Sequence, residues 1–183
     1  MGTDVREFII DGGGAGGSNK VVAVDLQQDF IDLGQQLYKG PTPGIEFRVA
    51  NLLDPKDTRV DDLKGKVTLL YTGAVFHLFE EHEQRLLAEK INSLFAKTGE
   101  VVAFGTHRGH KVAGRLTGSS GSWMGLKAFA HDPQSWKRMW TEVLGEDVKN
   151  WALNAKLKSH WTDAEDVDEN RPVLQWSLWR KDS

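Results

Sequence analysis

The sequence predicts an α/β fold, a three-layer sandwich in which helices cover a mostly parallel sheet that ends in an antiparallel pair. Short apolar runs, typical of strands buried on both faces, alternate with helical patterns over most of the chain. Near the C-terminus two stretches instead alternate apolar and polar residues, as strands of an antiparallel pair do. A chain of 183 residues is the size of one domain, so we expect a single domain over residues 1–183.

The composition excludes several classes of protein and site. A net charge of −3 gives no electrostatic basis for binding nucleic acid or an anionic membrane, and no apolar run approaches the roughly 20 residues that span a bilayer. The N-terminus lacks the basic and apolar segments of a secretory signal. The absence of cysteine excludes disulfides and thiolate metal sites and is compatible with a cytoplasmic location.

The first part of the chain carries two helical and two strand patterns. An amphipathic helix is followed by the apolar run Val21 to Val24, which ends in the acid Asp25. A second helix stops at Gly40-Pro41, and a second strand leads into a turn. The predicted bounds are 3–10 and 30–38 for the helices and 21–24 and 45–53 for the strands.

The glycine-rich segment 11–19 invites comparison with a phosphate-binding loop. Its glycines precede a strand, whereas a phosphate-binding loop follows a strand and opens a helix. The segment is therefore predicted to be a flexible loop.

The rest of the chain alternates strand and helix patterns before the final pair. The clearest helix has Gly99 beyond its C-terminal end as a cap, and the last helix has Asp132 as its N-cap, followed by Pro133. The acidic segment 163–170 is predicted to be a solvated loop. The predicted strands are 67–71, 100–105, 151–157 and 173–180, and the predicted helices are 80–97 and 133–144.

Several of these segments resemble one protein family over nearly the whole chain. The stretches VVAVDLQQDFIDLGQQL, FRVANLLDP, LLYTGAVFHLFEEHEQ and VVAFGTHRGHKVAG are similar, in this order, to the second to fifth strands of class I S-adenosylmethionine-dependent methyltransferases, especially a fungal natural-product branch. The resemblance implies a Rossmann-like sheet of truncated methyltransferase type. It also places Asp25 at the ribose of S-adenosylmethionine and Asn51 and Leu52 near the adenine.

The chain departs from this family at three places. Gly2 aligns with the last glycine of the cofactor motif, so the first strand and the earlier glycines have no counterpart. Asn51 stands where the family commonly has Asp, and the segment after Gly105 is unusually basic. Because the missing strand is central in the family's sheet, we expect its neighbours to pair with each other or a homodimer to cover the gap. No cofactor is expected to be needed.

Four polar residues near the ends of two predicted strands are candidate catalytic groups. His77 is a candidate general base, with a structural histidine as the alternative, and Tyr71 can donate a hydrogen bond to a substrate oxygen. His107 and Arg108, predicted to lie in a loop, suit an anion or an oxygenated substrate, with a solvated loop as the alternative. No metal site is predicted, because the pair His107 and His110 lacks a third ligand.

The seven tryptophans all fall between Trp123 and Trp179, which indicates a hydrophobic pocket or an interface, with a tryptophan-rich core as the alternative. The candidate substrate-binding walls, with core packing as the alternative, are Phe76, Trp123, Met124, Phe129 and Trp136.

Three functions remain open. The first is a methyltransferase-fold protein of fungal secondary metabolism that does not methylate. It would act as a cyclase or isomerase, including pericyclic, Diels–Alder-type chemistry, on a hydrophobic terpenoid or polyketide. The second is an S-adenosylmethionine-dependent small-molecule methyltransferase with an incomplete N-terminus, and the third is a non-catalytic binding partner.

Overall fold

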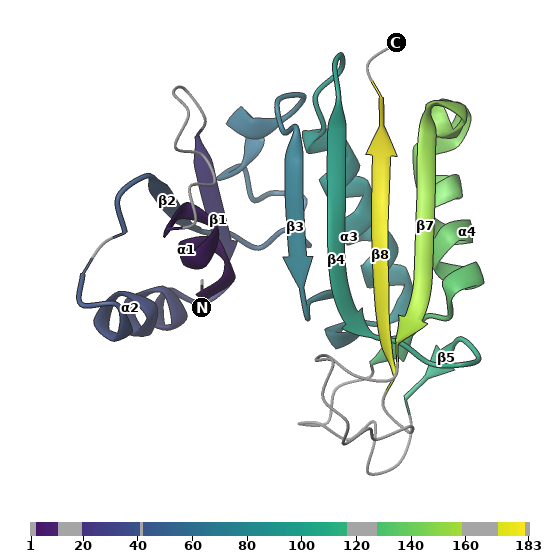
Figure 1. Cartoon of the computed structure of the whole chain (residues 1–183), viewed down its shortest axis with the longest axis horizontal. Coiled ribbons are helices and arrows are strands. Elements are labelled where there is room, and N and C mark those ends of the chain that lie inside the picture. The colour runs from purple at the N-terminus through teal and green to yellow at the C-terminus, as the bar shows by residue number, and fades with distance from the viewer. Residues whose placement is uncertain (1–2, 11–19, 41, 117–127, 159–171, 182–183) are drawn as a thin grey trace. The chain divides into compact units, whose positions relative to one another are not determined.

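The computed structural model describes residues 3–10, 20–40, 42–116, 128–158 and 172–181. The chain divides into two compact units, Met1–Asp62 and Leu63–Ser183. Each unit contains its own sheet (Figure 1).

The first unit is built around a parallel pair of strands. Strand β1 (Val21–Asp25) pairs with β2 (Ile45–Val49), and the unit also contains helices α1 (Thr3–Ile10) and α2 (Gln28–Leu37). In α2 the buried residues are Ile31 and Gly34. The sequence predicted all four elements, and the second strand ends four residues earlier than expected.

Arg6 of α1 is fully buried in the centre of the first unit. Its guanidinium lies over the rings of Tyr38 and Phe47, at 4.8 and 4.6 Å from the ring centroids. Its Nε donates a hydrogen bond to Thr42 Oγ1 at 2.9 Å. Two cation–π contacts and a hydrogen bond thus attach α1 to the end of α2 and to β2.

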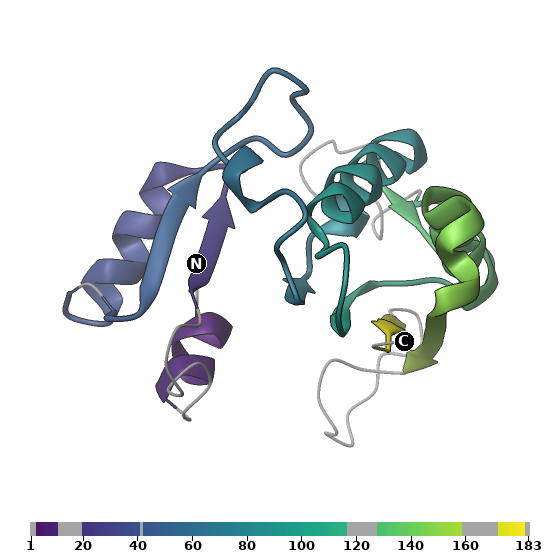
Figure 2. The ribbon, with the colours of Figure 1, turned by 90° about the horizontal axis from the view of Figure 1, so that it is seen from above.

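The second unit has a four-stranded mixed sheet covered on one face by two helices. The strand order is β3 (Leu69–Gly73), β4 (Val101–Arg108), β8 (Val173–Arg180), β7 (Trp151–Lys158). Strands β3 and β4 are parallel, and β8 is antiparallel to both of its neighbours. Figure 2 shows α3 and α4 on the same side of these strands. Helix α3 spans Glu81–Leu94 and α4 spans Pro133–Leu144, and the shorter elements are η1 (Asp61–Leu63), η2 (Phe76–Leu78), β5 (Gly114–Arg115), β6 (Phe129–Ala130) and η4 (Gly145–Asn150).

Aromatic side chains form the core between this sheet and its helices. The ring of Phe76 lies against those of Trp136, Trp140 and Trp176, at centroid distances of 4.8, 6.5 and 6.2 Å. All four side chains are buried, with exposed fractions of 2% or less. These tryptophans pack as the core alternative describes, and a role in substrate binding stays a prediction.

Helix α4 begins as predicted. Asp132 accepts hydrogen bonds from the backbone N–H groups of Gln134 and Ser135, and Pro133 occupies the first turn. These bonds satisfy two of the N–H groups that every helix start leaves without an intrahelical partner.

Helix α3 ends earlier than predicted, and its cap is Phe95 rather than Gly99. The carbonyl of Leu94 accepts hydrogen bonds from the N–H groups of Lys66 and Val67, so the chain entering β3 takes the place of the next helical turn. Gly99, with a φ of 81°, lies instead in the turn before β4.

Strand β4 is longer than predicted, and the assignment of His107 and Arg108 to a loop was wrong. Both residues belong to β4, where His107 pairs with Leu174 and Arg108 with Val173. Antiparallel pairing with β8 carries the strand through residues whose composition is typical of a loop.

Within the first unit β1 pairs with β2, and within the second unit β3 pairs with β4. The expected pairing between the two strands that flank the missing one would join the two units and stays a prediction. A homodimer that covers these edges stays a prediction. No helix in the described ranges is long and apolar enough to cross a membrane.

Candidate functional site

The carboxyl ends of β3 and β4 bring two of the predicted catalytic residues together. After Gly73 the chain turns at Ala74, whose φ of 55° lies in the left-handed region, and Ala74 N–H donates to the carbonyl of Thr106 at 2.7 Å. This turn leads directly into η2, which carries His77. Positive φ is costly for a residue with a side chain, and such strain gathers at functional sites.

His77 and His107 face each other in nearly parallel planes. Their ring centroids are 6.4 Å apart and their planes differ by 15°. His107 is 1% exposed and lies 4.6 Å from the indole of Trp136, whereas His77 is only partly buried. Within the described residues, His77 Nδ1 and both ring nitrogens of His107 have no hydrogen-bond partner. Buried polar atoms normally have a hydrogen-bond partner. These nitrogens are therefore available to a bound ligand or a water molecule.

Both imidazoles are held in the neutral state. Burial, followed by the nearby positive charge of Arg108, lowers the pKa of His77 to about 4. Burial also lowers the pKa of His107 well below its ordinary value, with smaller contributions from His77 and His131. Near neutral pH both rings can donate and accept hydrogen bonds without carrying charge.

His131 is a third buried histidine that the sequence did not single out. Its Nδ1 lies 2.9 Å from Ser135 Oγ, its ring lies 5.5 Å from that of Trp136, and its Nε2 has no partner in the described parts of the chain. Burial lowers its pKa to about 4. The one sequence feature that could have drawn attention to His131 is its position directly before Asp132, the N-cap of α4. This position places its ring at the start of the helix.

Tyr71 lies on the other face of the sheet. Side chains alternate along a strand, so Phe104 points away from the face that carries His107, and Tyr71 is its neighbour on β3. The two rings are 5.3 Å apart and 45% and 40% exposed. The four predicted catalytic residues therefore do not share one face.

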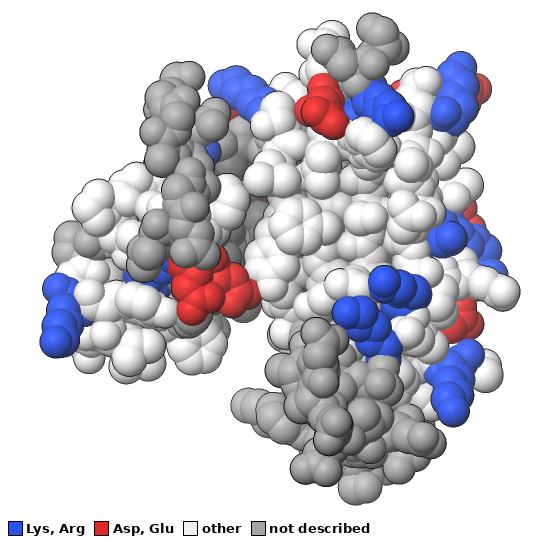
Figure 3. All heavy atoms as spheres, in the orientation of Figure 1, with Lys and Arg blue, Asp and Glu red and all other residues white. Residues whose placement is uncertain are grey.

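Tyr71 and Phe104 line a groove of about 680 Å³. Its other lining residues are Gly105, Thr106, Lys137, Asn154, Ala155, Lys156, Gln175, Trp176 and Ser177. The only charged residues in this set are lysines. Figure 3 shows the middle of this side of the sheet largely free of charge, with charged side chains toward both ends of the strands.

The predicted substrate-binding residues are spread over several environments. Phe76 and Trp136 lie in the core, and neither lines the groove. Phe129 is partly buried, with its ring 4.9 Å from that of His131. Trp123 and Met124 lie outside the described residues.

The predicted cofactor-binding residues lie in the first unit, at the carboxyl ends of β1 and β2. Asp25 Oδ1 accepts a hydrogen bond from Gln27 N–H at 2.9 Å. Asn51 Oδ1 accepts a hydrogen bond from Leu53 N–H at 3.0 Å. This bond lies in the turn that follows β2 and contains Leu52. Oδ2 of Asp25 and Nδ2 of Asn51 have no hydrogen-bond partner among the described residues, so an additional acceptor and an additional donor are present here. The two side chains thus fit part of S-adenosylmethionine.

In the described ranges, no cluster of three or more histidine, aspartate or glutamate side chains could hold a metal ion.

Comparison with known proteins shows which proteins the chain is similar to. No model of a known protein family matches the chain. The chain is 27% identical over 142 residues to the O-methyltransferase phiE of a fungal species (strain ATCC 74256), covering 76% of the chain and 46% of that protein. It is 25% identical over 176 residues to the methyltransferase trt5 of Aspergillus terreus, covering 94% of the chain and 59% of that protein.

Solved structures give the same fold. A putative S-adenosylmethionine-dependent methyltransferase from Listeria monocytogenes matches with a TM-score of 0.61 at 9% identity, covering 97% of the chain and 87% of that structure. The chain is similar to methyltransferases in sequence and in fold. The α/β fold of truncated Rossmann-like type that the sequence predicted is confirmed.

The methyltransferase-like chain spans about half the length of these curated relatives. A structure described as a pericyclic reaction enzyme shares the fold, with a TM-score of 0.54 and 13% identity, covering 97% of the chain and 40% of that structure. The fold is thus found both in methyltransferases and in an enzyme of a different reaction class.

Proposed function

We propose that this chain acts in the S-adenosylmethionine-dependent O-methylation of a hydrophobic fungal secondary metabolite, with His77 in contact with the acceptor oxygen. The observation that carries the proposal is the position of His77 after the turn that ends β3: the residue is partly exposed, and its buried ring nitrogen Nδ1 has no hydrogen-bond partner among the described residues. The similarity to fungal methyltransferases supports methyl transfer, and the name of phiE supports oxygen as the acceptor atom.

The lowered pKa of His77 sets the kind of acceptor. With a pKa of about 4, the imidazole accepts a proton from a carboxylic acid at almost no cost. Taking a proton from a phenol, whose pKa is about 10, costs about 8 kcal/mol at 1.36 kcal/mol per pKa unit. His77 therefore suits an acceptor that is already acidic, such as a carboxylic acid or an enolised dicarbonyl, which it orients by a hydrogen bond.

Asp25 and Asn51 supply the groups suited to the cofactor. The second oxygen of the Asp25 carboxylate accepts hydrogen bonds from ribose hydroxyls, and the Asn51 amide nitrogen donates a hydrogen bond to the adenine. When bound, S-adenosylmethionine supplies an electrophilic methyl group.

Calorimetric titration with S-adenosylmethionine and with its demethylated product tests this assignment. Asp25→Asn keeps an acceptor for Gln27 N–H but removes the charge, so it should weaken binding without unfolding the first unit. Asp32→Asn is the matched control, because Asp32 is exposed on α2. Wild-type protein that gives no heat of binding with either compound refutes the cofactor assignment.

A second candidate is cofactor-free cyclisation or isomerisation of a hydrophobic terpenoid or polyketide. The observation that favours it is the set of neutral imidazoles beside aromatic rings, which offers hydrogen bonds but no strong base. His77 and His107, whose rings face each other, would then act as polar anchors. Conversion of a metabolite to an isomer of unchanged mass, at the same rate with and without S-adenosylmethionine, would favour this reaction over methyl transfer.

A further inference from the structure

A second pocket lies at the opposite end of the four-stranded sheet from the histidines. It is found where β4 begins, β8 ends and β7 begins, beside the C-terminal end of α3. Its volume is about 410 Å³, within the range of small-molecule sites. The lining residues are Glu89, Asn92, Ser93, Phe95, Ala96, Lys97, Leu144, Asp147, Trp151 and Arg180.

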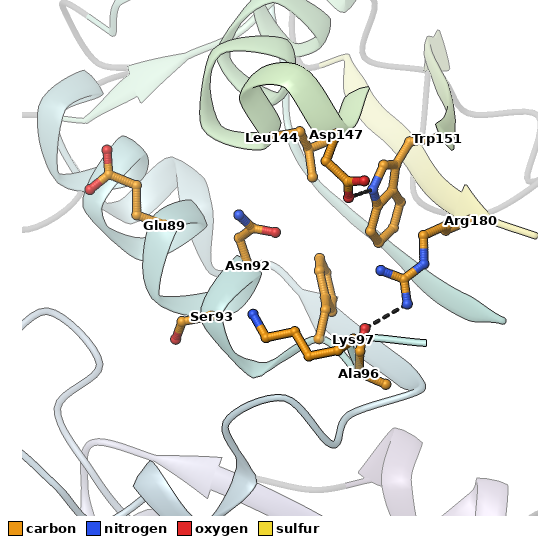
Figure 4. Close-up of a pocket in the computed structure, with 10 residues that line it drawn as sticks. Glu89, Asn92, Ser93, Ala96, Lys97, Leu144, Asp147, Trp151 and Arg180 are labelled. Atoms are coloured by element: carbon orange, nitrogen blue, oxygen red, sulfur yellow. Dashed lines mark hydrogen bonds between the residues drawn. The ribbon is translucent and has the colours of Figure 1, made fainter. Parts of the chain in front are cut away.

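Two cations in this pocket, Lys97 and Arg180, form no ion pair with a carboxylate of the described residues. Lys97 makes no ion pair or hydrogen bond among the described residues, and its ammonium points toward the same space as the Asn92 amide (Figure 4). Arg180 makes no ion pair in the described part of the chain. Its Nη2 donates to the carbonyls of Ala96 and Gly99, at 2.5 and 3.2 Å, which holds the guanidinium in place.

Of the two acids of the pocket, Asp147 acts on Arg180 but forms no ion pair with it in the described part of the chain: hydrogen bonds from Trp151 and Asn150, and then the charge of Arg180, lower the pKa of Asp147. Each oxygen of Asp147 already accepts a hydrogen bond, one from Trp151 Nε1 at 2.8 Å and one from Asn150 Nδ2 at 2.7 Å. The carboxylate of Glu89 points away from the pocket (Figure 4). Among the charged groups that face the pocket, the N–H groups still available for hydrogen bonds are therefore those of Lys97 and Arg180. These donors favour binding of an anion.

Aromatic surface lies beside the cations. The rings of Phe95 and Trp151 are 5.2 Å apart, and the guanidinium of Arg180 lies 5.3 Å from the centroid of the Trp151 ring. A planar apolar group can pack against these rings while an anionic group on it reaches Lys97 and Arg180.

We propose that this pocket binds a small carboxylate with a planar, apolar body, at a site separate from the histidine site. The carboxylate pairs with Lys97 and with the N–H groups of Arg180 that the carbonyls leave free. Lys97 follows α3 and Arg180 ends β8, so the ligand joins the end of the helix to the end of the strand. Binding to the folded state alone raises the melting temperature as ligand is added.

Benzoate is the probe, and benzamide is its neutral counterpart of nearly the same shape. The binding variant is Lys97→Met, which removes the charge of an exposed side chain and spares Arg180, whose replacement would free two carbonyls. The matched control is Lys66→Met, which is also exposed and lies outside the pocket.

Calorimetry and thermal unfolding of the full chain are expected to show saturable benzoate binding and a rise in melting temperature in the wild type and in Lys66→Met. Lys97→Met should weaken binding at least tenfold, and benzamide should have no effect. Absence of benzoate binding, equal binding by Lys97→Met, or an equal response to benzamide would each overturn the proposal.

Discussion

The imidazole of His107 lies 4.6 Å, centroid to centroid, from the indole of Trp136, and neither of its ring nitrogens has a hydrogen-bond partner among the described residues. Each unsatisfied buried polar group costs roughly 1–3 kcal/mol. A histidine in this position therefore lowers stability unless water or a ligand reaches it, as is typical of residues retained for function rather than for folding.

Replacing His107 by leucine is expected to raise the free energy of unfolding by roughly 1 kcal/mol, because the buried nitrogens are removed at similar volume. Urea unfolding measures the change. His131→Leu is the comparison, and it should gain less because it also loses the contact with Ser135 Oγ. A loss of stability in His107→Leu would mean that a bound group already satisfies the ring.

Stability is expected to fall as the pH drops from about 6.5 toward 4. The pKa values of His77 and His131 are lowered to about 4 in the folded state, while the unfolded chain keeps the ordinary value of 6.5. In this window the unfolded state binds more protons, so each such histidine lowers the free energy of unfolding by up to about 1.4 kcal/mol per pH unit. Above pH 6.5 these histidines are neutral in both states, so their contribution to the free energy of unfolding no longer changes with pH.

Urea midpoints measured between pH 4 and 8 test this slope, and His131→Leu should flatten it. The carboxylates with lowered pKa values, among them Asp132, act only at still lower pH. A wild-type profile that is flat from pH 7 to 4.5 would contradict the burial of these histidines.

Gly105→Ala is expected to destabilise the protein strongly, by about 3 kcal/mol or more. A Cβ at this position would lie 2.0 Å from the Thr72 carbonyl oxygen and 3.0 Å from Trp176 Cζ2. Gly114→Ala is the control, because nothing lies within 4 Å of its Cβ position. Thermal unfolding should separate the two variants clearly, and equal melting temperatures would argue against the packing of β3 on β4.

Removing the cap of α4 by Asp132→Ala should lower the free energy of unfolding by about 1–2 kcal/mol. The side chain accepts hydrogen bonds from two N–H groups of the helix and from that of Ala113, so three donors lose their partner. Urea unfolding is the measurement, with the exposed Glu146→Ala as control. An effect no larger than that of the control would show that the cap contributes nothing.

Much of the fold follows from local sequence patterns. The N-cap of α4 and the final antiparallel pair were visible because each depends on neighbouring residues alone. The length of β4 was not visible, because the ladder with β8, far along the chain, carries it through His107 and Arg108. The end of α3 was missed for the same reason, since its last carbonyl is taken by residues that precede β3.

The candidate site was predicted only in part. Side-chain alternation along β4, which decides that His107 and Tyr71 lie on different faces, requires the register with β3. His131 was missed because a lone histidine in the sequence does not reveal that its side chain is buried, here with an exposed fraction of 1%. The pocket at Lys97 and Arg180 joins residues that are distant in sequence, and no local pattern indicates it.

The measurement that tests the account most directly is transfer of a trideuterated methyl group from labelled S-adenosylmethionine to acidic metabolites of a fungal extract, followed by mass spectrometry. Wild-type protein and His82→Gln, whose side chain is 70% exposed, should label an oxygen of a carboxylic acid or an enolised dicarbonyl. His77→Gln should slow the transfer about 100-fold. If no product of the wild-type protein carries the label, or if His77→Gln transfers it at the wild-type rate, the proposed role of His77 in methyl transfer is wrong.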